Sequence, residues 1–274
     1  SDNLMRFQTH WVGSLTVCVL IVTGGIGFLV VAELWNRPPL NRRSWRRLSL
    51  HSKLVLTTTA LLILAGAAAI FFMERSNTLS ALTAHDRILT ALFQSITTRT
   101  AGFNTLPIEA MASETLFVII MLMFIGASPG SCGGGVKTTT FSTILLLGIA
   151  RLKGRDHPLA YYRKIPESSV AKAISVATLS LMVIVVGTLF LTMSELGGVS
   201  RLQSQGDFFE LLFEAVSAFG TVGLSMGATS GLSTAGKLVV SAVMFIGRLG
   251  PLVLAIAVSR RRAPRFTYAE EKVM

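Results

Sequence analysis

The sequence has little charge and few of the side chains that most often carry chemistry. Only 14% of its 274 residues are charged, and it contains 14 acidic residues, four histidines and two cysteines. A soluble domain of this length would carry more charge, whereas 51% of these residues are hydrophobic and the mean hydropathy is +0.62. This balance is typical of an integral membrane protein.

The scarcity of cysteine, histidine and acid excludes several kinds of site. Cys18 and Cys132 both lie in membrane-type sequence, so we expect neither a disulfide nor a metal site at them. The histidines are scattered without the spacing of metal ligands, and no nucleophile–base pair or carboxylate dyad stands out. We therefore expect no enzymatic activity and no covalently bound cofactor.

Bases outnumber acids, with a formal net charge of +11 and an isoelectric point near 10.5. Such an excess can indicate a nucleic-acid partner. Here, however, the bases collect in short segments between apolar spans, around residues 37–53, 151–172 and 260–265. That distribution is the positive-inside pattern. It predicts a multi-pass protein of the cell membrane, in contact with the lipid bilayer and with no nucleic acid, whose basic loops and C-terminus are cytoplasmic.

Five apolar runs predict helices that cross or enter the membrane. They cover residues 11–35, 54–73, 115–149, 170–193 and 238–258. The third run is too long for one crossing, because about 35 helical residues would measure ~52 Å against an oily core of ~30 Å. Its glycine-rich middle, residues 126–137, cannot form regular helix. Since non-helical backbone at membrane depth is tolerated only inside protein or beside a water-filled cavity, this break is predicted to face a conduction path.

Two shorter amphipathic runs lie between these spans, at residues 86–97 and 207–218. About twelve helical residues span only ~18 Å, half a bilayer, so each run predicts a re-entrant half-helix. Thr83 and Asp86 are predicted to cap the first half-helix. At the second, the spacing of Asp207 and Glu210 predicts a capping box.

Each half-helix leads into a turn of small residues centred on Thr-x-Gly. The turns read Thr-Arg-Thr-Ala-Gly-Phe-Asn at 98–104 and Phe-Gly-Thr-Val-Gly-Leu-Ser at 219–225. Met-Phe-Ile-Gly also recurs 121 residues later, at 123–126 and 244–247, so the chain contains a direct repeat. A single such turn could be an ordinary loop, but two in register favour a site at the repeat interface. Glycine there lets carbonyls point sideways into a lumen, which is how a cation-selective pore is lined.

Four motifs together carry a family resemblance. They are Thr-Ala-Gly-Phe-Asn at 100–104, Gly-Thr-Val-Gly-Leu-Ser at 220–225, Gly-Ala-Ser-Pro-Gly-Ser-x-Gly-Gly-Gly-x-Lys-Thr at 126–138 and Gly-Arg-Leu-Gly-Pro at 247–251. Over essentially its whole length the chain resembles the potassium-translocating subunit of the Trk/Ktr/HKT superfamily, and most of all the Ktr type. Cys132 departs from the threonine expected at that place.

The resemblance implies an all-α integral membrane protein of repeated helix–pore-loop–helix units, four of which enclose one pore. Residues 1–53 would be the last helix of the second unit and a cytoplasmic loop. Residues 54–169 would be the third unit, with its broken second helix, and residues 170–274 the fourth unit and the cytoplasmic C-terminus. The first half of the pore is missing, so the chain would supply two of four filter loops and would not enclose a pore alone.

The resemblance also implies an ion filter. Backbone carbonyls would replace part of the hydration shell of K⁺, the transported ion, with Na⁺ as the candidate coupling ion. The filter residues would be Thr100, Ala101, Gly102, Thr221, Val222 and Gly223. Independently of the resemblance, the negative C-terminal ends of both half-helices would favour a cation at these turns. Arg99, within the first turn, is expected to be a solvated charge that points away from the lumen, with Glu109 or Glu114 as alternative partners.

A gate is implied beneath the filter. Its residues would be Gly126, Gly130, Gly133, Gly134, Gly135, Lys137 and Arg248. Arg248 is predicted near the middle of an apolar helix, too far from either interface to snorkel, so its charge must face protein, a cavity or water. The alternative to gating is that Arg248 only caps carbonyls of the glycine-rich loop. A phosphate-binding loop is excluded there because Val136 separates the glycines from the lysine.

The function predicted is potassium uptake across the cell membrane through a backbone-carbonyl filter, gated by the glycine-rich loop. The resemblance implies a homodimer on a cytoplasmic nucleotide-binding ring of the KtrA or TrkA type, with the basic loops and C-terminal end as docking surface. Two alternatives stay open. One is a secondary transporter that binds a solute or another cation, such as Na⁺, at the broken helices. The other is a membrane scaffold that transports nothing.

Overall fold

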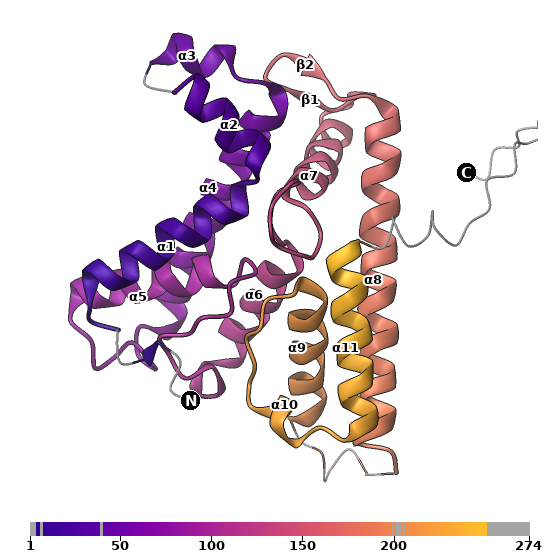
Figure 1. Ribbon diagram of the computed structural model, residues 1–274. Coiled ribbons are helices and arrows are strands. Elements are labelled where there is room, and N and C mark those ends of the chain that lie inside the picture. The colour runs from indigo at the N-terminus through magenta and orange to yellow at the C-terminus, as the bar shows by residue number, and fades with distance from the viewer. Residues whose placement is uncertain are drawn as a thin grey trace, which may run out of the picture.

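The computed structural model describes residues 4–5, 8–38, 41–198, 200, 204 and 206–250, without the side chains of residues 42 and 43. Their regular secondary structure is almost entirely helical (Figure 1). The elements are α1 (Trp11–Ile26), α2 (Phe28–Asn36), α3 (Arg42–Arg47), α4 (Leu50–Glu74), α5 (Ala84–Thr97), a 3-10 turn (Ile108–Ala110), α6 (Ser113–Phe124), α7 (Thr138–Leu152), β1 (Leu159–Ala160), β2 (Arg163–Lys164), α8 (Glu167–Glu195), α9 (Asp207–Gly220), α10 (Ala228–Gly231) and α11 (Thr234–Leu249). The basic residues at 260–265, predicted to hold the C-terminus in the cytoplasm, lie outside the described residues.

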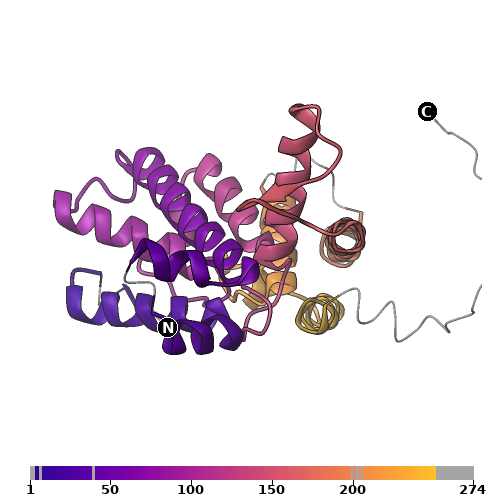
Figure 2. The ribbon, with the colours of Figure 1, turned by 90° about the horizontal axis from the view of Figure 1, so that it is seen from above.

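Two helices are long and apolar enough to cross a membrane, α4 with 25 residues and α8 with 29. Both extend beyond the apolar runs that predicted them. Together with the shorter apolar helices α6 and α7, they confirm the fold class, a mostly helical membrane protein. In Figure 1, α8, α9 and α11 stand side by side, and Figure 2 looks down the axes of α8 and α11 while α1 and α4 run across the view.

The first apolar run bends sharply. α1 and α2 meet at Gly27 with a bend of 101°. Gly27 has φ +91°, and a Cβ on it would collide with the carbonyl oxygen of Pro129. The backbone N–H of Phe28 donates to the carbonyl of Gly130 at 3.1 Å. The bend therefore packs against the distant 126–137 segment.

The repeat is visible in how helices pack. A side chain at Gly66 on α4 would lie 2.7 Å from Leu122 on α6, and one at Gly187 on α8 would lie 2.8 Å from Val243 on α11. The second pair follows the first by 121 residues, the shift found in the sequence. In both units, therefore, a glycine on the outer helix lets the inner helix approach closely.

A glutamate at the end of each outer helix holds the start of the inner helix. The carboxylate of Glu74 accepts from the backbone N–H of Ala112 at 2.8 Å, and that of Glu195 accepts from the N–H of Ser233 at 3.1 Å. Ala112 and Ser233 are the N-cap residues of α6 and α11. These bonds satisfy N–H groups that a helix start leaves without partners, and they fix the far end of each pore loop.

Both half-helices are present, with 14 residues each, or ~21 Å. Thr83 caps α5 as predicted, accepting from the N–H of Asp86 at 3.4 Å. The capping box predicted for α9 is wrong, because Gly206 is the N-cap and the helix already includes Asp207 in its first turn. There Asp207 and Glu210 act on the positive end of the helix dipole instead.

The two repeats share one hydrophobic core beneath the half-helices. Ile119 and Met123 of α6 and Phe213 and Phe219 of α9 are each fully buried in the same cluster. The ring of Phe219 also stacks on that of Phe124 with centroids 6.5 Å apart. This packing places the end of α9 against the end of α6.

The apolar run of residues 115–149 breaks as predicted. α6 ends at Phe124 and the helix resumes as α7 at Thr138. Between them Ile125 and Val136 form a parallel bridge, with the N–H of Val136 donating to the carbonyl of Phe124 at 3.2 Å. In the fourth unit α11 ends at Leu249, so Arg248 occupies its last turn rather than the middle of a longer helix. Residues 251–258, also predicted to be helical, lie outside the described residues.

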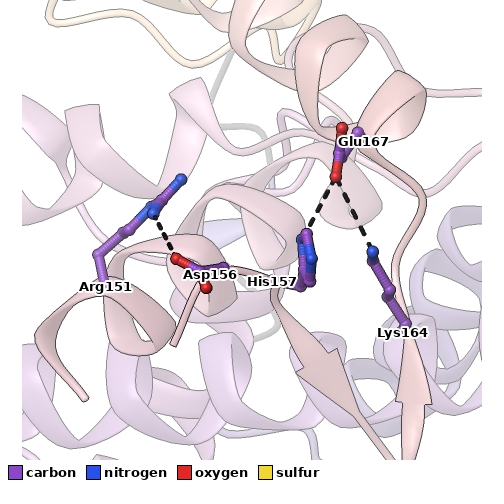
Figure 3. Close-up of polar contacts among 5 residues, drawn as sticks. All are labelled: Arg151, Asp156, His157, Lys164 and Glu167. Carbon is purple, nitrogen blue, oxygen red and sulfur yellow. Dashed lines mark ion pairs between the residues drawn. The ribbon is translucent and has the colours of Figure 1, made fainter. Parts of the chain in front are cut away.

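A short hairpin of β1 and β2 comes after α7 and was not predicted. Glu167 at the start of α8 lies 3.4 Å from His157 and 3.8 Å from Lys164 (Figure 3). Arg151 at the end of α7 lies 3.7 Å from Asp156. All of these side chains are largely exposed, so the ion pairs contribute little to stability.

Candidate ion-conduction site

The two Thr-x-Gly turns lie against one another. A Cβ on Gly102 would collide with the carbonyl oxygen of Val222 and lie 3.2 Å from the Cα of Gly223. A Cβ on Gly223 would in turn lie 3.7 Å from the Cα of Gly102. The structure therefore brings residues 100–102 and 221–223 together, at the interface of the repeats.

Backbone conformation repeats between the turns. Thr100 and Thr221 have φ of 67° and 51°, and the glycines two residues later have φ of 76° and 91°. A left-handed conformation is uncommon for a β-branched residue and costs energy that the surrounding structure must supply. Only the glycines gave a signal in the sequence. The strained threonines were missed because threonine carries no preference for this region.

Hydroxyl groups at the ends of the half-helices fasten both turns. Thr97 donates from its Oγ1 to the carbonyl of Phe103 at 2.5 Å. Ser217 donates to the carbonyl of Leu224 at 2.6 Å and accepts from the N–H of Gly223 at 3.2 Å. The turns therefore begin directly at the C-terminal ends of α5 and α9, where the helix dipoles are negative.

The site offers oxygen atoms without clustered carboxylates. Within the described part of the chain, no three His, Cys, Asp or Glu side chains gather into a metal site. Thr100, Ala101 and Gly102 are half-buried and Gly223 is exposed, whereas Val222 is buried. Carbonyl and hydroxyl oxygens at the turns can coordinate a monovalent cation weakly, as conduction requires.

The glycine-rich segment 126–137 contacts a threonine in each of the two turns. The N–H of Gly134 donates to Oγ1 of Thr221 at 3.0 Å. A Cβ on Gly133 would lie 3.0 Å from Cγ2 of Thr100 and collide with its hydroxyl. Only glycine permits this approach of one backbone to the other turn. A third glycine, Gly135, has φ 70°.

Two positively charged side chains donate hydrogen bonds to this segment. Lys137 donates from Nζ to the carbonyl of Gly133 at 2.5 Å, and Nη1 of Arg248 donates to the carbonyl of Cys132. Gly126 lies at the start of the segment, where a Cβ would collide with the carbonyl of Gly134. These predicted gate residues are therefore brought together.

Gly130 is the exception among them. It lies against the bend between α1 and α2, with a Cβ position 3.1 Å from the ring of Phe28. Arg99 also differs from its expectation of a solvated charge, because only 7% of it is exposed. Among the described residues it forms no ion pair with Glu109 or Glu114.

A cavity of about 430 Å³ adjoins this site. Its lining comes from three segments, which are α1, the first filter turn and the glycine-rich segment. Thr100, Ala101, Cys132 and Gly133 all contribute to its wall. The filter turn and the segment below it are thus reached from the same open space.

Comparison with known proteins gives consistent matches. The TrkH family, described as a cation transport protein, matches residues 1–265. The chain is 37% identical over 274 residues to the Ktr system potassium uptake protein B of Bacillus subtilis (strain 168), covering 99% of this chain and 58% of that protein. It is 35% identical over 277 residues to the potassium/sodium uptake protein NtpJ of Enterococcus hirae, covering 100% of this chain and 59% of that protein. The chain thus spans less than two thirds of the length of these relatives.

The fold is similar to that in the crystal structure of the potassium transporter TrkH from Vibrio parahaemolyticus. The TM-score is 0.67 at 21% identity, and the match covers 90% of this chain and 52% of that one. The breadth of the family match and the identity to the relatives agree with the paired turns and the broken helix described above. This chain belongs to the TrkH family of cation transport proteins.

Proposed function

We propose that this chain supplies two adjacent filter loops of a potassium-uptake pore. The observation that carries the proposal is the contact of the two turns, in which Gly102 lies against the carbonyl of Val222. Carbonyls of residues 100–102 and 221–223 would replace part of the hydration shell of K⁺. In this assignment residues 1–53 belong to a second pore unit, residues 54–169 form a third and residues 170–274 a fourth.

We further propose that the 126–137 segment gates the filter. Support comes from its contacts with Thr100 and Thr221. The side chains of Lys137 and Arg248 also donate hydrogen bonds to its backbone carbonyls. Moving residues 132–135 aside would break the hydrogen bonds of Gly134 to Thr221 and of Arg248 to Cys132, and the glycines have no side chains that would have to leave a packed position. A positive charge directly below the filter would also oppose the passage of cations until it moved.

The transported ion and the partners are proposed on the same assignment. The relatives' names attribute potassium uptake to one and potassium/sodium uptake to the other, which supports K⁺ as the transported ion and Na⁺ as a coupling or second ion. We propose a multi-pass location in the cell membrane with a cytoplasmic C-terminus. The working unit would be a homodimer on a cytoplasmic nucleotide-binding ring, docked through the basic loops.

The test uses the complete transporter that contains this chain, reconstituted in liposomes. K⁺ and Na⁺ influx are measured for the wild type and for Arg248→Ala, with Lys237→Ala as a matched control on the same helix. We expect K⁺ influx that exceeds Na⁺ influx, and an altered rate or ion preference in Arg248→Ala alone. An unchanged rate and preference in Arg248→Ala would reject the gate, and no K⁺ influx in the wild type would reject the pore.

A secondary transporter is the second candidate, and the break at 125–137 together with the bend at Gly27 favours it, because discontinuous helices bind solutes at mid-membrane. The two candidates differ in kinetics. A pore gives single-channel K⁺ currents, whereas a secondary transporter gives saturable exchange without unitary currents. Electrical recording from the same reconstituted protein separates them.

A further inference from the structure

The loop between α2 and α4 is held in shape by side-chain hydrogen bonds. The carboxylate of Glu33 on α2 accepts from the backbone N–H and from the hydroxyl of Ser49 at 2.7 Å each, which joins the two ends of the loop. Across the loop, the hydroxyl of Ser44 donates to the carbonyl of Pro38 at 2.6 Å. The chain therefore builds the described part of this loop from its own contacts.

Beside this loop lies a cavity of about 510 Å³. It is lined by Asn36, Arg37, Asn41, Ser44 and Arg47. Both arginines are exposed, and neither forms an ion pair within the described part of the chain. The wall therefore presents two guanidinium groups and two amides without a carboxylate among them.

The sequence supplies no acid to neutralise this wall. From residue 34 to residue 73 it contains no aspartate or glutamate. Glu33 attracts Arg37 at longer range, but its oxygens already accept from Ser49 and Ser52. Two positive side chains thus face one cavity with their charge uncompensated.

The corresponding loop of the next unit, between α7 and α8, is different. Its cations pair with its own acids, with Arg151 3.7 Å from Asp156 and Lys164 3.8 Å from Glu167 (Figure 3). An unpaired basic wall is therefore not a general property of these loops. It belongs to the loop between α2 and α4, which indicates that this loop takes its negative partner from outside the chain.

The donors in the wall indicate the chemistry of that partner. A guanidinium group donates two parallel hydrogen bonds to a phosphate or a carboxylate, and an amide adds further N–H donors. A phosphate group has more acceptor oxygens than a carboxylate, so two arginines and two amides can bind it together. The cavity is also within the size range of ligand sites, about 300–1,000 Å³.

The position of the cavity allows two sources of phosphate. The loop lies at the same end of the molecule as the β1–β2 hairpin (Figure 1), and Nζ of Lys53 is 5.8 Å from the ring of Tyr161. Trp35 is 87% exposed and Trp45 is half-buried. Tryptophan is enriched where a membrane meets water, and arginines beside a spanning helix attract anionic lipid headgroups. A soluble phosphate can also reach an exposed wall.

We propose that Arg37 and Arg47, together with the amides of Asn36 and Asn41, bind a phosphate group in this cavity. The group belongs either to an anionic lipid headgroup or to a soluble phosphate. This site goes beyond the proposed pore, and its existence does not depend on the filter or the gate.

Occupancy of the site has a consequence at the other end of α2. There the N–H of Phe28 donates to the carbonyl of Gly130, and Gly27 packs against Pro129. Nine helical residues, or ~14 Å, separate this contact from the cavity. A ligand that holds the end of α2 therefore also restrains the 126–137 segment, a consequence that rests on the proposed gate.

The first experiment measures binding to the complete transporter in detergent. Phosphatidylglycerol is the lipid probe and inorganic phosphate the soluble probe. The wild type is compared with Arg37→Gln/Arg47→Gln. The matched control is Arg155→Gln/Arg163→Gln, which removes two exposed arginines of the other loop that form no ion pair in the described part of the chain.

We expect the wild type and the control to bind at least one probe, and Arg37→Gln/Arg47→Gln to bind it about tenfold more weakly or worse. Arg37→Lys/Arg47→Lys keeps the charge but loses the bidentate geometry, so it should recover only part of the affinity. The probe that binds identifies the source of the phosphate. No binding of either probe by the wild type, or equal losses in both glutamine variants, would overturn the proposal.

The second experiment tests the consequence at the gate. The probe that binds is added to the transporter in liposomes, and it should change K⁺ influx about fivefold or more in the wild type but not in Arg37→Gln/Arg47→Gln. Binding without any change in influx would reject the coupling through α2. Binding by a wild type that conducts no K⁺ under any condition would reject the proposed function and leave the phosphate site standing.

Discussion

The same tetrapeptide, Met-Phe-Ile-Gly, has two structures in this chain. In the third unit the helix stops at Phe124, two residues before Gly126, whereas in the fourth unit α11 continues past Gly247 to Leu249. A Cβ on Gly126 would collide with the carbonyl oxygen of Gly134, and a Cβ on Gly247 would collide with the carbonyl oxygen of Phe219. Close backbone approach is common to both, so the glycine is needed for packing and does not itself end the helix.

The residues on the C-terminal side of the tetrapeptide decide its structure. After Gly126 comes a segment with three consecutive glycines that folds back on the helix end through the bridge of Ile125 and Val136. After Gly247 come Arg248 and Leu249, both good helix formers, and the helix stops just before Pro251 in the sequence. In one repeat the glycine-rich segment thus follows the tetrapeptide directly, whereas in the other the helix runs on for two residues past it, to Leu249.

The two Thr-x-Gly turns, proposed above as filter loops, also differ. The fourth-unit turn is fastened from within, because Ser217 makes two hydrogen bonds to it and Glu214 accepts from Ser225 just beyond it. In the third-unit turn the corresponding fastener is the bond from Thr97, and Arg99 beside it has unpaired donors among the described residues. Both turns also contact the 126–137 segment, through Gly134 at Thr221 and through Gly133 at Thr100, so neither turn holds its shape alone.

The largest expected effect distinguishes the two filter glycines. Gly102→Ala should cost roughly 2–5 kcal/mol of stability and abolish K⁺ influx, since left-handed strain adds to a collision with the Val222 carbonyl. Gly223→Ala should cost only about 1–2 kcal/mol, because a Cβ there has its nearest neighbour at 3.7 Å. Thermal unfolding and K⁺ influx of both variants measure the difference. Equal losses would mean that the two turns are equally constrained.

The second comparison sets Glu74 against Glu195. Glu74 is fully buried and holds four donors from Ala112, Asn77 and Thr78, so Glu74→Ala should lower stability by roughly 2–4 kcal/mol. Glu195 is half-buried and its partners can bind water instead, so Glu195→Ala should cost about 1 kcal/mol. Unfolding temperatures in the same detergent compare them. A larger loss at Glu195 would contradict the ranking by burial.

The third comparison concerns the hydroxyls that fasten the turns. Ser217→Ala removes two hydrogen bonds and should cost about 1–3 kcal/mol, whereas Thr97→Val removes one and should cost about 0.5–1.5 kcal/mol. Loss of shape at a filter also changes ion preference, so the ratio of K⁺ to Na⁺ influx should fall more in Ser217→Ala. If Thr97→Val had the larger effect on that ratio, the third-unit turn would be the more critical one.

Patterns with strong local causes were predictable from the sequence. The half-helices were predicted from run length and amphipathicity, the break at 126–137 from its glycines, and the meeting of the turns from the repeat. The capping of α5 by Thr83 was equally local.

Features that depend on distant contacts were not predictable. The bend at Gly27 depends on its contact with Pro129, and the left-handed conformations of Thr100 and Thr221 depend on the hydrogen bonds that hold the turns. The burial of Arg99 depends on the segments that pack around it. The early end of α11, which leaves Arg248 in a last turn, was also missed, because hydropathy continues where the helix stops. Tertiary packing decided the first three, whereas the end of α11 coincides with Gly250, which has φ 85°, and with Pro251 after it in the sequence.

The smallest expected effect lies outside the membrane core, at Glu167. Like Glu74 it is a terminal glutamate of a long helix with more than one partner, but it begins α8 and its side chain is 76% exposed. Water competes for both His157 and Lys164, so Glu167→Gln should change stability by less than about 0.5 kcal/mol and leave K⁺ influx unchanged. Raising the salt concentration should abolish even that difference, because exposed pairs are screened. A loss of stability comparable to that of Glu74→Ala would mean that burial does not determine how much each carboxylate stabilises the protein. The ranking of Glu74 above Glu195 by burial would then also fail.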